Sequence, residues 1–331
     1  MNDSSLYRIL DASANRACEA LRVLEDYVRF VRDDAFLTEQ LKTVRHGVVS
    51  AIACFPMETR LAFRETQKDV GTTISVPTEF HRESVAHVLA ANFSRLQESL
   101  RSLEEFSKIS CPEAAHQFEQ MRYLSYTLQR AVRFVSKDTF GDARFYALVD
   151  TSGDFPAKIE RLLRLGTDVF QLRDKGADDR TLVCFGRQLR TLLDLRQDKK
   201  RWMILNDRAD LCVVCRADGV HVGQEELTVR DARRMVGDTR LVGVSTHTLT
   251  QARQAVLDGA DYIGCGPTFP SGTKAFDHFP GLDFLRQVAA EITLPAFAIG
   301  GITAENVSRV YETGFTRVAC AQAAEEVFAK S

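Results

Sequence analysis

The sequence predicts an α/β protein in which a (β/α)8 barrel of the TIM type follows an all-helical bundle. Three observations point to this fold. Residues 1–136 show helical periodicity with an internal repeat, residues 137–144 are polar and contain a glycine, and from residue 145 short apolar runs alternate eight times with helix-length segments. Strict strand–helix alternation gives a parallel sheet, and eight repeats close it. We therefore expect a linker over residues 137–144 and a closed barrel over residues 145–331.

The overall composition is that of an ordinary globular protein and excludes several classes of function. The chain has 331 residues, 45% hydrophobic and 27% charged, with a formal net charge of −2. A nucleic-acid-binding protein would need a clustered basic excess. No apolar run approaches the ~20 residues that span a bilayer, and the first residues lack the apolar segment of a signal peptide. We predict a cytoplasmic protein that binds neither nucleic acid nor membrane.

The eight cysteines lie mostly inside apolar runs. In a reducing compartment such residues are usually buried small hydrophobes. Cys212 and Cys215 have CxxC spacing, but no second Cys/His pair follows at the spacing of a zinc site. We expect them to pack on a helix rather than to bind a metal.

The first 136 residues predict amphipathic helices. Over residues 14–30 the apolar side chains recur at i, i+3, i+4 and i+7, which places them on one helix face. The same period occurs over residues 42–53, 84–106 and 114–135. Residues 65–78 lack the period and contain glycine and proline, so we predict a loop there.

These helices contain an internal repeat. Residues 19–26, EALRVLED, recur as residues 98–105, ESLRSLEE, and six of the eight aligned positions keep their type. We predict a duplicated bundle with approximate two-fold symmetry. Within each copy Glu19 and Arg22, or Glu98 and Arg101, can pair on one helix face. Two interpretations stay open: a salt-bridge set that holds the helices in register, or a small polar site on the pseudo-two-fold axis.

The barrel elements follow from the alternation of apolar runs. Strands are predicted at residues 145–149, 169–172, 203–205, 219–222, 241–244, 262–264, 296–299 and 317–320. Helices are predicted at residues 156–165, 181–195, 208–216, 228–236, 249–258, 282–291, 304–313 and 321–330. Side chains just after each strand face one shared mouth, where enzymes of this fold place their active sites.

Cationic side chains follow the second predicted strand. Alternation sends Gln171, Arg173 and Lys175 to one side of the chain. Arginine offers a planar fork and lysine a point charge, a combination that suits a diphosphate. Such a short pattern on its own is also typical of a charged surface loop.

Carboxylates and an amide follow the next two strands. Asn206 and Asp207 end the third strand, and Glu226 follows the fourth. Two carboxylates beside basic residues suggest Mg²⁺ that bridges to phosphate oxygens. Asp207 could instead cap the helix that follows it.

The later strand ends supply hydroxyls, glycines and a cation. Ser245 and His247 follow the fifth strand, where the histidine is a candidate acid/base or a packed side chain. The longest loop, residues 264–274, carries Ser271, Thr273 and Lys274, and its length marks it as functional. After the seventh strand, residues 300–301 are glycines whose backbone could approach a phosphate at a helix N-terminus.

Taken together, the mouth is predicted to have two anion sites and a metal, and no nucleophile–base pair stands out in the sequence. Such a mouth suits a transfer reaction in which diphosphate leaves and a phosphorylated second substrate attacks.

Residues 145–330 resemble the thiamine phosphate synthase (thiamine-phosphate pyrophosphorylase) family. The motifs occur in family order and spacing: QLRDK at 171–175, ND at 206–207, ADGVHVGQEE at 217–226, GVSTHT at 243–248, DGADYIGCGPTFPSGTK at 258–274 and AIGGIT at 298–303. The resemblance implies a barrel enzyme, a transferase of thiamine biosynthesis, that joins hydroxymethylpyrimidine diphosphate to thiazole phosphate. It implies a dissociative reaction, with Mg²⁺ as cofactor. Residues 1–136 are similar to an N-terminal extension found fused to some members, a possible route to a homo-oligomer.

The resemblance also implies roles for single residues. The pyrimidine diphosphate would be bound by Gln171, Leu172, Arg173, Asp174, Lys175, Asn206, Ser245 and Lys274, among which Arg173, Lys175, Ser245 and Lys274 would be catalytic. The thiazole phosphate would be bound by Ser271, Gly272, Thr273, Gly301, Ala321 and Gln322. Asp207 and Glu226 would hold Mg²⁺.

Three positions depart from the family pattern. Glu226 replaces a usual Asp, Ser271 a usual Thr, and the pair Ala321 and Gln322 a usual hydrophobic–Ser pair. These changes bear on affinity for the metal and for thiazole phosphate more than on the reaction type. The alternatives are a related thiazole tautomerase that uses His247 for proton transfer, and a non-catalytic ligand-sensing or scaffold protein.

Overall fold

The computed structural model describes residues 3–65, 81–134, 139–270 and 280–330. The chain divides into two compact units, Met1–Arg133 and Phe134–Ser331. The loop predicted over residues 65–78 lies almost wholly outside the described residues. In the part of the chain that is described, no helix has the length and apolar character needed to cross a membrane.

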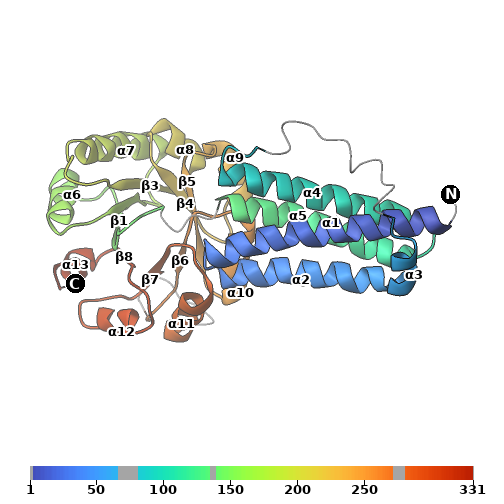
Figure 1. The fold of residues 1–331 in the computed structure, drawn as a ribbon. Coiled ribbons are helices and arrows are strands. Elements are labelled where there is room, and N and C mark those ends of the chain that lie inside the picture. The colour runs from blue at the N-terminus through green and yellow to red at the C-terminus, as the bar shows by residue number, and fades with distance from the viewer. Residues whose placement is uncertain (1–2, 66–80, 135–138, 271–279, 331) are drawn as a thin grey trace. The chain divides into compact units, whose positions relative to one another are not determined.

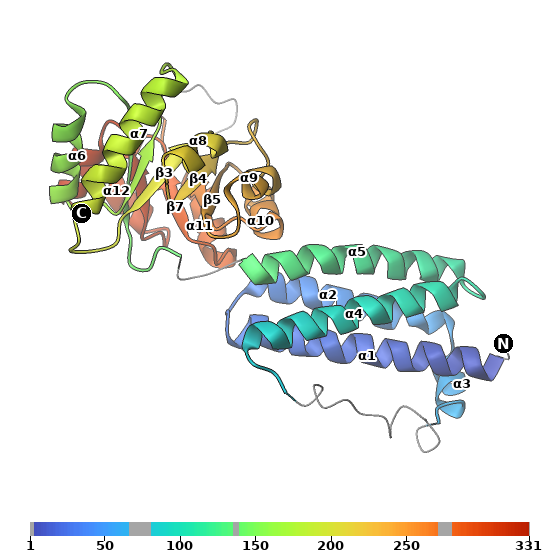
Figure 2. The same ribbon diagram turned by 90° about the horizontal axis from the view of Figure 1, so that it is seen from above.

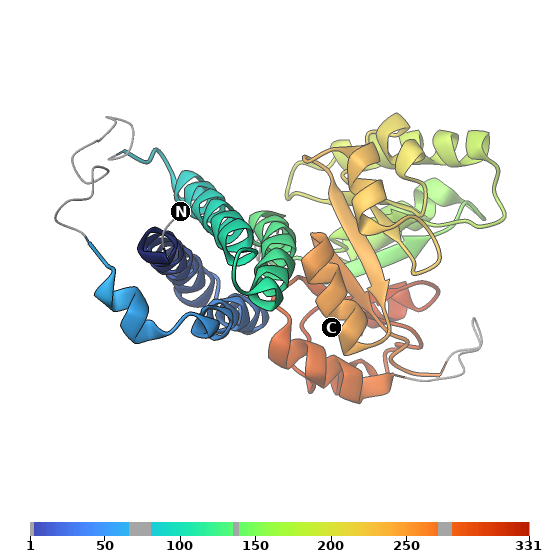
Figure 3. The ribbon, with the colours of Figure 1, turned by 90° about the vertical axis from the view of Figure 1, so that its right-hand side faces the viewer.

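The first unit is a bundle of long helices that run alongside one another (Figure 2) and enclose a common interior (Figure 3). Asp34 and Ser84 begin two of them, because each side chain accepts a hydrogen bond from a backbone N–H three residues later. The periodic leucines of the first helix, Leu10, Leu21 and Leu24, are fully buried. The helices are α1 Asp3–Phe30, α2 Ala35–Ala51, α4 Val85–Ser107 and α5 Pro112–Phe134, with the shorter η1 Ile52–Cys54 and α3 Met57–Ala62.

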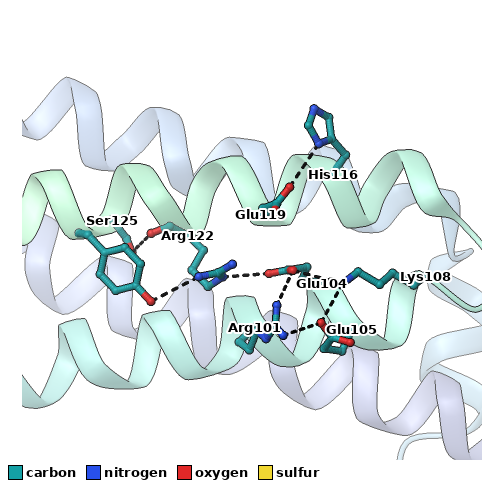
Figure 4. A network of polar contacts seen from close by, with 9 residues as sticks. Arg101, Glu104, Glu105, Lys108, His116, Glu119, Arg122 and Ser125 are labelled. Carbon is teal, nitrogen blue, oxygen red and sulfur yellow. Dashed lines mark hydrogen bonds and ion pairs between the residues drawn. The ribbon is translucent and has the colours of Figure 1, made fainter.

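A buried glutamate joins two helices of the bundle in the second copy of the repeat (Figure 4). Glu104 of α4 is 2% exposed. It accepts hydrogen bonds from Arg101 of its own helix at 2.6 Å and from Arg122 of α5 at 2.9 Å. A carboxylate this well buried is stable as an anion only if it is paired. Arg101 pairs with it within α4, and Arg122 joins it to α5.

The first copy of the repeat has the same arrangement. Glu25 of α1 accepts from Arg22 at 3.3 Å and from Arg45 of α2 at 3.0 Å. The pairs expected with Glu19 and Glu98 were therefore wrong, because each arginine contacts the buried acid three residues after it in the chain. These inter-helix contacts support the salt-bridge interpretation of the repeat.

The second unit is a closed barrel of parallel strands in chain order, surrounded by helices (Figure 1). The first strand pairs with both the second and the last, which closes the sheet. The strands are β1 Phe145–Val149, β2 Val169–Leu172, β3 Trp202–Asn206, β4 Gly219–Val222, β5 Leu241–Thr246, β6 Tyr262–Cys265, β7 Ala296–Ile299 and β8 Val318–Cys320. The predicted α/β fold class, a barrel after a helical region, is confirmed.

Helices α6, α7, α9 and α10 of the barrel begin directly after a capping side chain. Asp154, Asp178, Thr228 and Thr248 each accept a hydrogen bond from a backbone N–H of the first turn that follows. The helices are α6 Phe155–Arg164, α7 Asp179–Asp194, α8 Ala209–Val214, α9 Val229–Val236, α10 Leu249–Asp258, α11 Gly281–Glu291, α12 Val307–Tyr311 and α13 Ala324–Lys330.

Helix α12 is much shorter than the predicted 304–313. The Asn306 side chain accepts from the backbone N–H of Thr303 at 2.9 Å and donates to the carbonyl of Gly301 at 2.9 Å. These local bonds compete with helix formation and hold residues 301–306 in a turn.

An aromatic side chain from before the first strand fills one end of the barrel. Phe140 is fully buried and packs edge-to-face on Tyr262 and Phe297, with ring centroids 5.0 and 5.3 Å apart. Its ring also lies 5.2 Å from that of Trp202. The segment that the composition marks as a linker thus supplies part of the barrel's core.

Candidate active site

The site is built from the residues that follow the carboxyl ends of the strands. On β2, Gln171 points into the barrel and is 3% exposed. Its Nε2 donates to the hydroxyl of Tyr146 at 2.8 Å, and that hydroxyl lies 3.1 Å from the hydroxyl of Tyr262. Leu172 ends the strand and is buried. The hydrogen bond to Tyr146 therefore holds the Gln171 side chain in one orientation inside the barrel.

The loop after β2 is braced by its own acid. The carboxylate of Asp174 accepts from the Thr151 hydroxyl at 2.5 Å and from the backbone N–H of Gly176 at 3.0 Å. These bonds hold the pKa of Asp174 below its usual value, the hydroxyl bond most strongly. Because they fix the loop to the end of β1, they set the positions of the exposed Arg173 and Lys175 on either side of it.

A lysine lies between the two predicted metal ligands. The Nζ of Lys175 is 3.8 Å from Oδ2 of Asp207 and 3.7 Å from Oε1 of Glu226. Burial raises the pKa of Asp207, and the charge of Glu226 raises it further. Two carboxylates that repel each other in this way favour a cation between them, and in this structure the ammonium group supplies that charge.

Asp207 does not cap the helix that follows it. Helix α8 has Arg208 at its N-cap position and lacks a side-chain cap. Instead, Oδ2 of Asp207 accepts from Asn206 at 2.6 Å, and its backbone N–H donates to the carbonyl of His221 at 2.8 Å. Its φ of 59° is in the left-handed region, which is uncommon outside glycine. The chain therefore leaves β3 with a turn that directs this carboxylate to the neighbouring strand.

Glu226 reaches the same place by folding back over a glycine. A Cβ built at Gly223 would lie 2.1 Å from its Oε2. The absence of a side chain there makes room for an arm one methylene longer than aspartate. Asp207 and Glu226 form an all-oxygen pair of the kind Mg²⁺ accepts, completed by water and phosphate oxygens. The described residues contain no larger cluster of possible metal ligands, so these two would be the protein's contribution.

Ser245 lies beside a histidine that sequence reasoning missed. The Ser245 Oγ on β5 is 3.0 Å from Nε2 of His221 on β4. The Ser245 carbonyl accepts from Gln224 at 2.5 Å. Burial lowers the pKa of His221 to about 4, and the charge of Arg173 contributes. The signal was present in the sequence GVHV, where a polar residue alternates with buried valines, as it would on the inner face of a barrel strand.

His247 is engaged with backbone. Its Nδ1 lies 2.5 Å from the carbonyl oxygen of Gly266, and its own N–H donates to Gln251 at 2.7 Å. The ring therefore ties the end of β5 to the start of the loop after β6.

The glycines after β7 pack against the start of that loop. A Cβ at Gly300 would lie 2.8 Å from Pro267, and one at Gly301 would lie 2.5 Å from the carbonyl oxygen of Phe269. The backbone N–H of Phe269 donates to the carbonyl of Gly300 at 2.9 Å. The close backbone approach explains both glycines.

The remaining predicted residues are placed as follows. Ala321 and Gln322 are exposed directly after β8, before α13 begins. Ser271, Gly272, Thr273 and Lys274 lie outside the described residues. The structure thus brings together Arg173, Lys175, Asn206, Asp207 and Glu226 around one point of the mouth, with His221, Ser245 and Gln171 on the adjoining inner strands.

Each of the two units matches a known protein family. Residues 145–324 match the family described as thiamine monophosphate synthase, and residues 8–131 match the ThiD2 family. A thiamine-phosphate synthase of Rhodopirellula baltica is 44% identical over 95% of this chain and 87% of its own length. One of Thermosynechococcus vestitus is 36% identical over 96% and 90%. A solved thiamine phosphate pyrophosphorylase from Pyrococcus furiosus gives a TM-score of 0.51 at 25% identity, covering 58% of this chain and 95% of that one.

Proposed function

The chain belongs to the thiamine monophosphate synthase family, and from that membership we infer that it is the transferase that makes thiamine phosphate. The substrates are hydroxymethylpyrimidine diphosphate and thiazole phosphate. The observation that supports this function best is the placement of Lys175 between Asp207 and Glu226, with Arg173 on the same loop. Carboxylates for a metal and cations for a diphosphate meet there at one point of the mouth.

One set of residues is assigned to the pyrimidine diphosphate: Gln171, Leu172, Arg173, Asp174, Lys175, Asn206, Ser245 and Lys274. Of these, Arg173, Lys175, Ser245 and Lys274 are the proposed catalytic residues. Asp207 and Glu226 would hold Mg²⁺, which would supply positive charge to the diphosphate oxygens. The carboxylate of Asp174 also keeps the loop after β2 in place.

The reaction proceeds by departure and capture. The C–O bond between the pyrimidine methylene and the diphosphate breaks, and both electrons leave with the diphosphate. The thiazole nitrogen then donates its lone pair to the resulting pyrimidine methyl cation and forms the new C–N bond. Catalysis of this kind needs positioning and charge stabilisation more than an acid or a base. The cations at the strand ends fit that need.

The second substrate is assigned to the later strands. Gly301, Ala321 and Gln322, with Ser271, Gly272 and Thr273, bind the thiazole phosphate. Gln322 gives this site an amide where a hydroxyl is usual, so its hydrogen bond to phosphate comes from N–H.

The helical unit, residues 1–136, is proposed to support dimerisation or stability. The boundary we propose lies before the segment 137–144, and the enzyme acts in the cytoplasm.

The function is tested with the purified full-length chain, both phosphorylated substrates and Mg²⁺. We expect diphosphate and thiamine phosphate in equal amounts. A tautomerase would convert a thiazole isomer without releasing diphosphate, and a scaffold protein would do neither. Folded protein that releases no diphosphate would overturn the assignment.

A further inference from the structure

His221 and Ser245 form a contact whose direction can be worked out. They stand on neighbouring parallel strands, with Nε2 and Oγ 3.0 Å apart. The imidazole packs against the ring of Tyr262, with the two ring centroids 5.3 Å apart. The imidazole also lies close to Gly264 of β6, since a Cβ built at that glycine would be only 3.2 Å from Cε1 of the ring. The ring is therefore held in one place, and only its protons are free to vary.

The other ring nitrogen decides where the proton sits. Nδ1 of His221 is buried and has no hydrogen-bond partner among the described residues. A neutral imidazole has one N–H donor and one bare acceptor nitrogen. A buried N–H without an acceptor is rarer in proteins than an under-satisfied acceptor. Nδ1 is thus the bare nitrogen, and the proton is on Nε2.

A doubly protonated ring is disfavoured on the same grounds. It would leave an N–H unpaired at Nδ1 and add a positive charge near Arg173, whose charge already acts on this ring. Tyr262, whose ring packs against the imidazole, is a neutral phenol that offers no counter-charge.

We propose that His221 is a positioning residue for the transfer reaction: its Nε2–H donates to Ser245 Oγ, which turns the Ser245 O–H away from the ring so that it donates toward an acceptor atom of the pyrimidine diphosphate. This rests on the proposed function. Among the described residues, His221 is the partner recorded for that hydroxyl, and the Ser245 carbonyl is already used by Gln224. Without the imidazole, the hydroxyl could rotate and present its lone pairs to the substrate.

The proton position is measured first, without substrate. Nitrogen-15 NMR of the full-length chain, with labelled histidines and a His221→Gln variant to assign the signal, should show a neutral Nε2–H imidazole. A proton on Nδ1 would overturn the proposal, because Ser245 would then be the donor to the ring. This measurement stands whether or not the protein releases diphosphate, so it fails separately from the proposed function.

The consequence for catalysis is measured by a double-mutant cycle. His221→Phe and Ser245→Ala should each lower kcat/KM by about tenfold, the scale of one neutral hydrogen bond. The double variant should be no worse than Ser245→Ala, because the two residues act through one hydroxyl. His221→Gln, whose amide can still donate, should retain more activity than His221→Phe. Additive losses, or equal activity of the Gln and Phe variants, would contradict the proposal. Near-UV circular dichroism checks that each variant is folded, and the NMR result remains decisive if His221→Phe is not.

Discussion

The carboxylate of Glu226 occupies the space where a side chain at Gly223 would be, since a Cβ there would lie 2.1 Å from Oε2. Gly223→Ala should therefore push Glu226 away from Asp207 and weaken Mg²⁺ binding by about tenfold or more. A Mg²⁺ titration of diphosphate release would show a higher half-saturating concentration. Glu225→Ala removes an exposed carboxylate next to the site and serves as the control. Equal Mg²⁺ dependence in the wild type and Gly223→Ala would argue that Glu226 is not a metal ligand.

Lys175 and Asp207 should both be needed for the rate. Lys175→Ala removes a cation from the proposed diphosphate site, and Asp207→Ala removes the more buried of the two proposed metal ligands. Each is expected to lower kcat by roughly 10²-fold or more, the usual loss when a charge-stabilising group is removed. Cys212→Ala, a buried change on α8, should leave kcat unchanged. Wild-type rates in either charged variant would remove that residue from the site.

Stability should depend on pH through His221. Its pKa is about 4 in the folded chain, against ~6.5 when unfolded. As pH falls below 6.5, the unfolded chain binds a proton that the folded chain does not, so this contribution to stability is lost. Between about pH 7.5 and pH 5 the wild type should lose roughly 2 kcal/mol more than His221→Phe. Urea unfolding of the barrel at both pH values measures the difference, and parallel losses would show that His221 is not buried as a neutral ring.

In the helical unit, alanine substitutions at the adjacent residues Glu104 and Glu105 should differ sharply in their effect on stability. Glu104 is buried between two arginines, whereas the side chain of Glu105 is 44% exposed. Glu104→Ala leaves buried arginine charge unpaired and should cost about 3 kcal/mol or more. Glu105→Ala should cost less than about 1 kcal/mol. Thermal unfolding followed by circular dichroism compares the two, and similar midpoints would mean that the buried pair contributes little.

Removal of residues 1–136 tests the role of the helical unit. If that unit supports dimerisation or stability, the truncated chain should be of lower oligomeric state or lower melting temperature than the full chain. Size-exclusion chromatography with light scattering and a thermal scan measure both. A truncated protein that is active, soluble and of unchanged oligomeric state would refute this role.

The strand positions were predictable because each is a short apolar run bounded by polar or glycine residues. Four predicted strands match the structure at both ends, including β4 Gly219–Val222. The start of helix α12 could not be predicted in this way. It depends on the side-chain hydrogen bonds of Asn306, which do not change the spacing of apolar residues along the chain. Spacing along one helix also could not identify the acids that pair with Arg22 and Arg101. Each of those acids, Glu25 and Glu104, is also bound by an arginine from another helix.

Site residues that follow the ends of strands could be predicted from the sequence, whereas site residues inside the barrel were harder to predict. Asp207 and Glu226 were placed together from topology alone, and the structure brings both to Lys175. Tyr146 and Tyr262 were missed because they lie within strands that are otherwise apolar, and His221 was missed although its place between two valines of β4 was a signal. Their importance depends on which face of the strand turns inward, which the closed sheet decides.

Phe140 has a consequence for how the two units can be joined or separated. The barrel's floor is completed by a residue five positions upstream of its first strand. A fragment that begins at β1 would expose Trp202, Tyr262 and Phe297 at an open base, at a cost on the order of 3–5 kcal/mol. A free-standing barrel must therefore begin before Phe140, so the segment between the two units is part of the barrel's minimal folding unit.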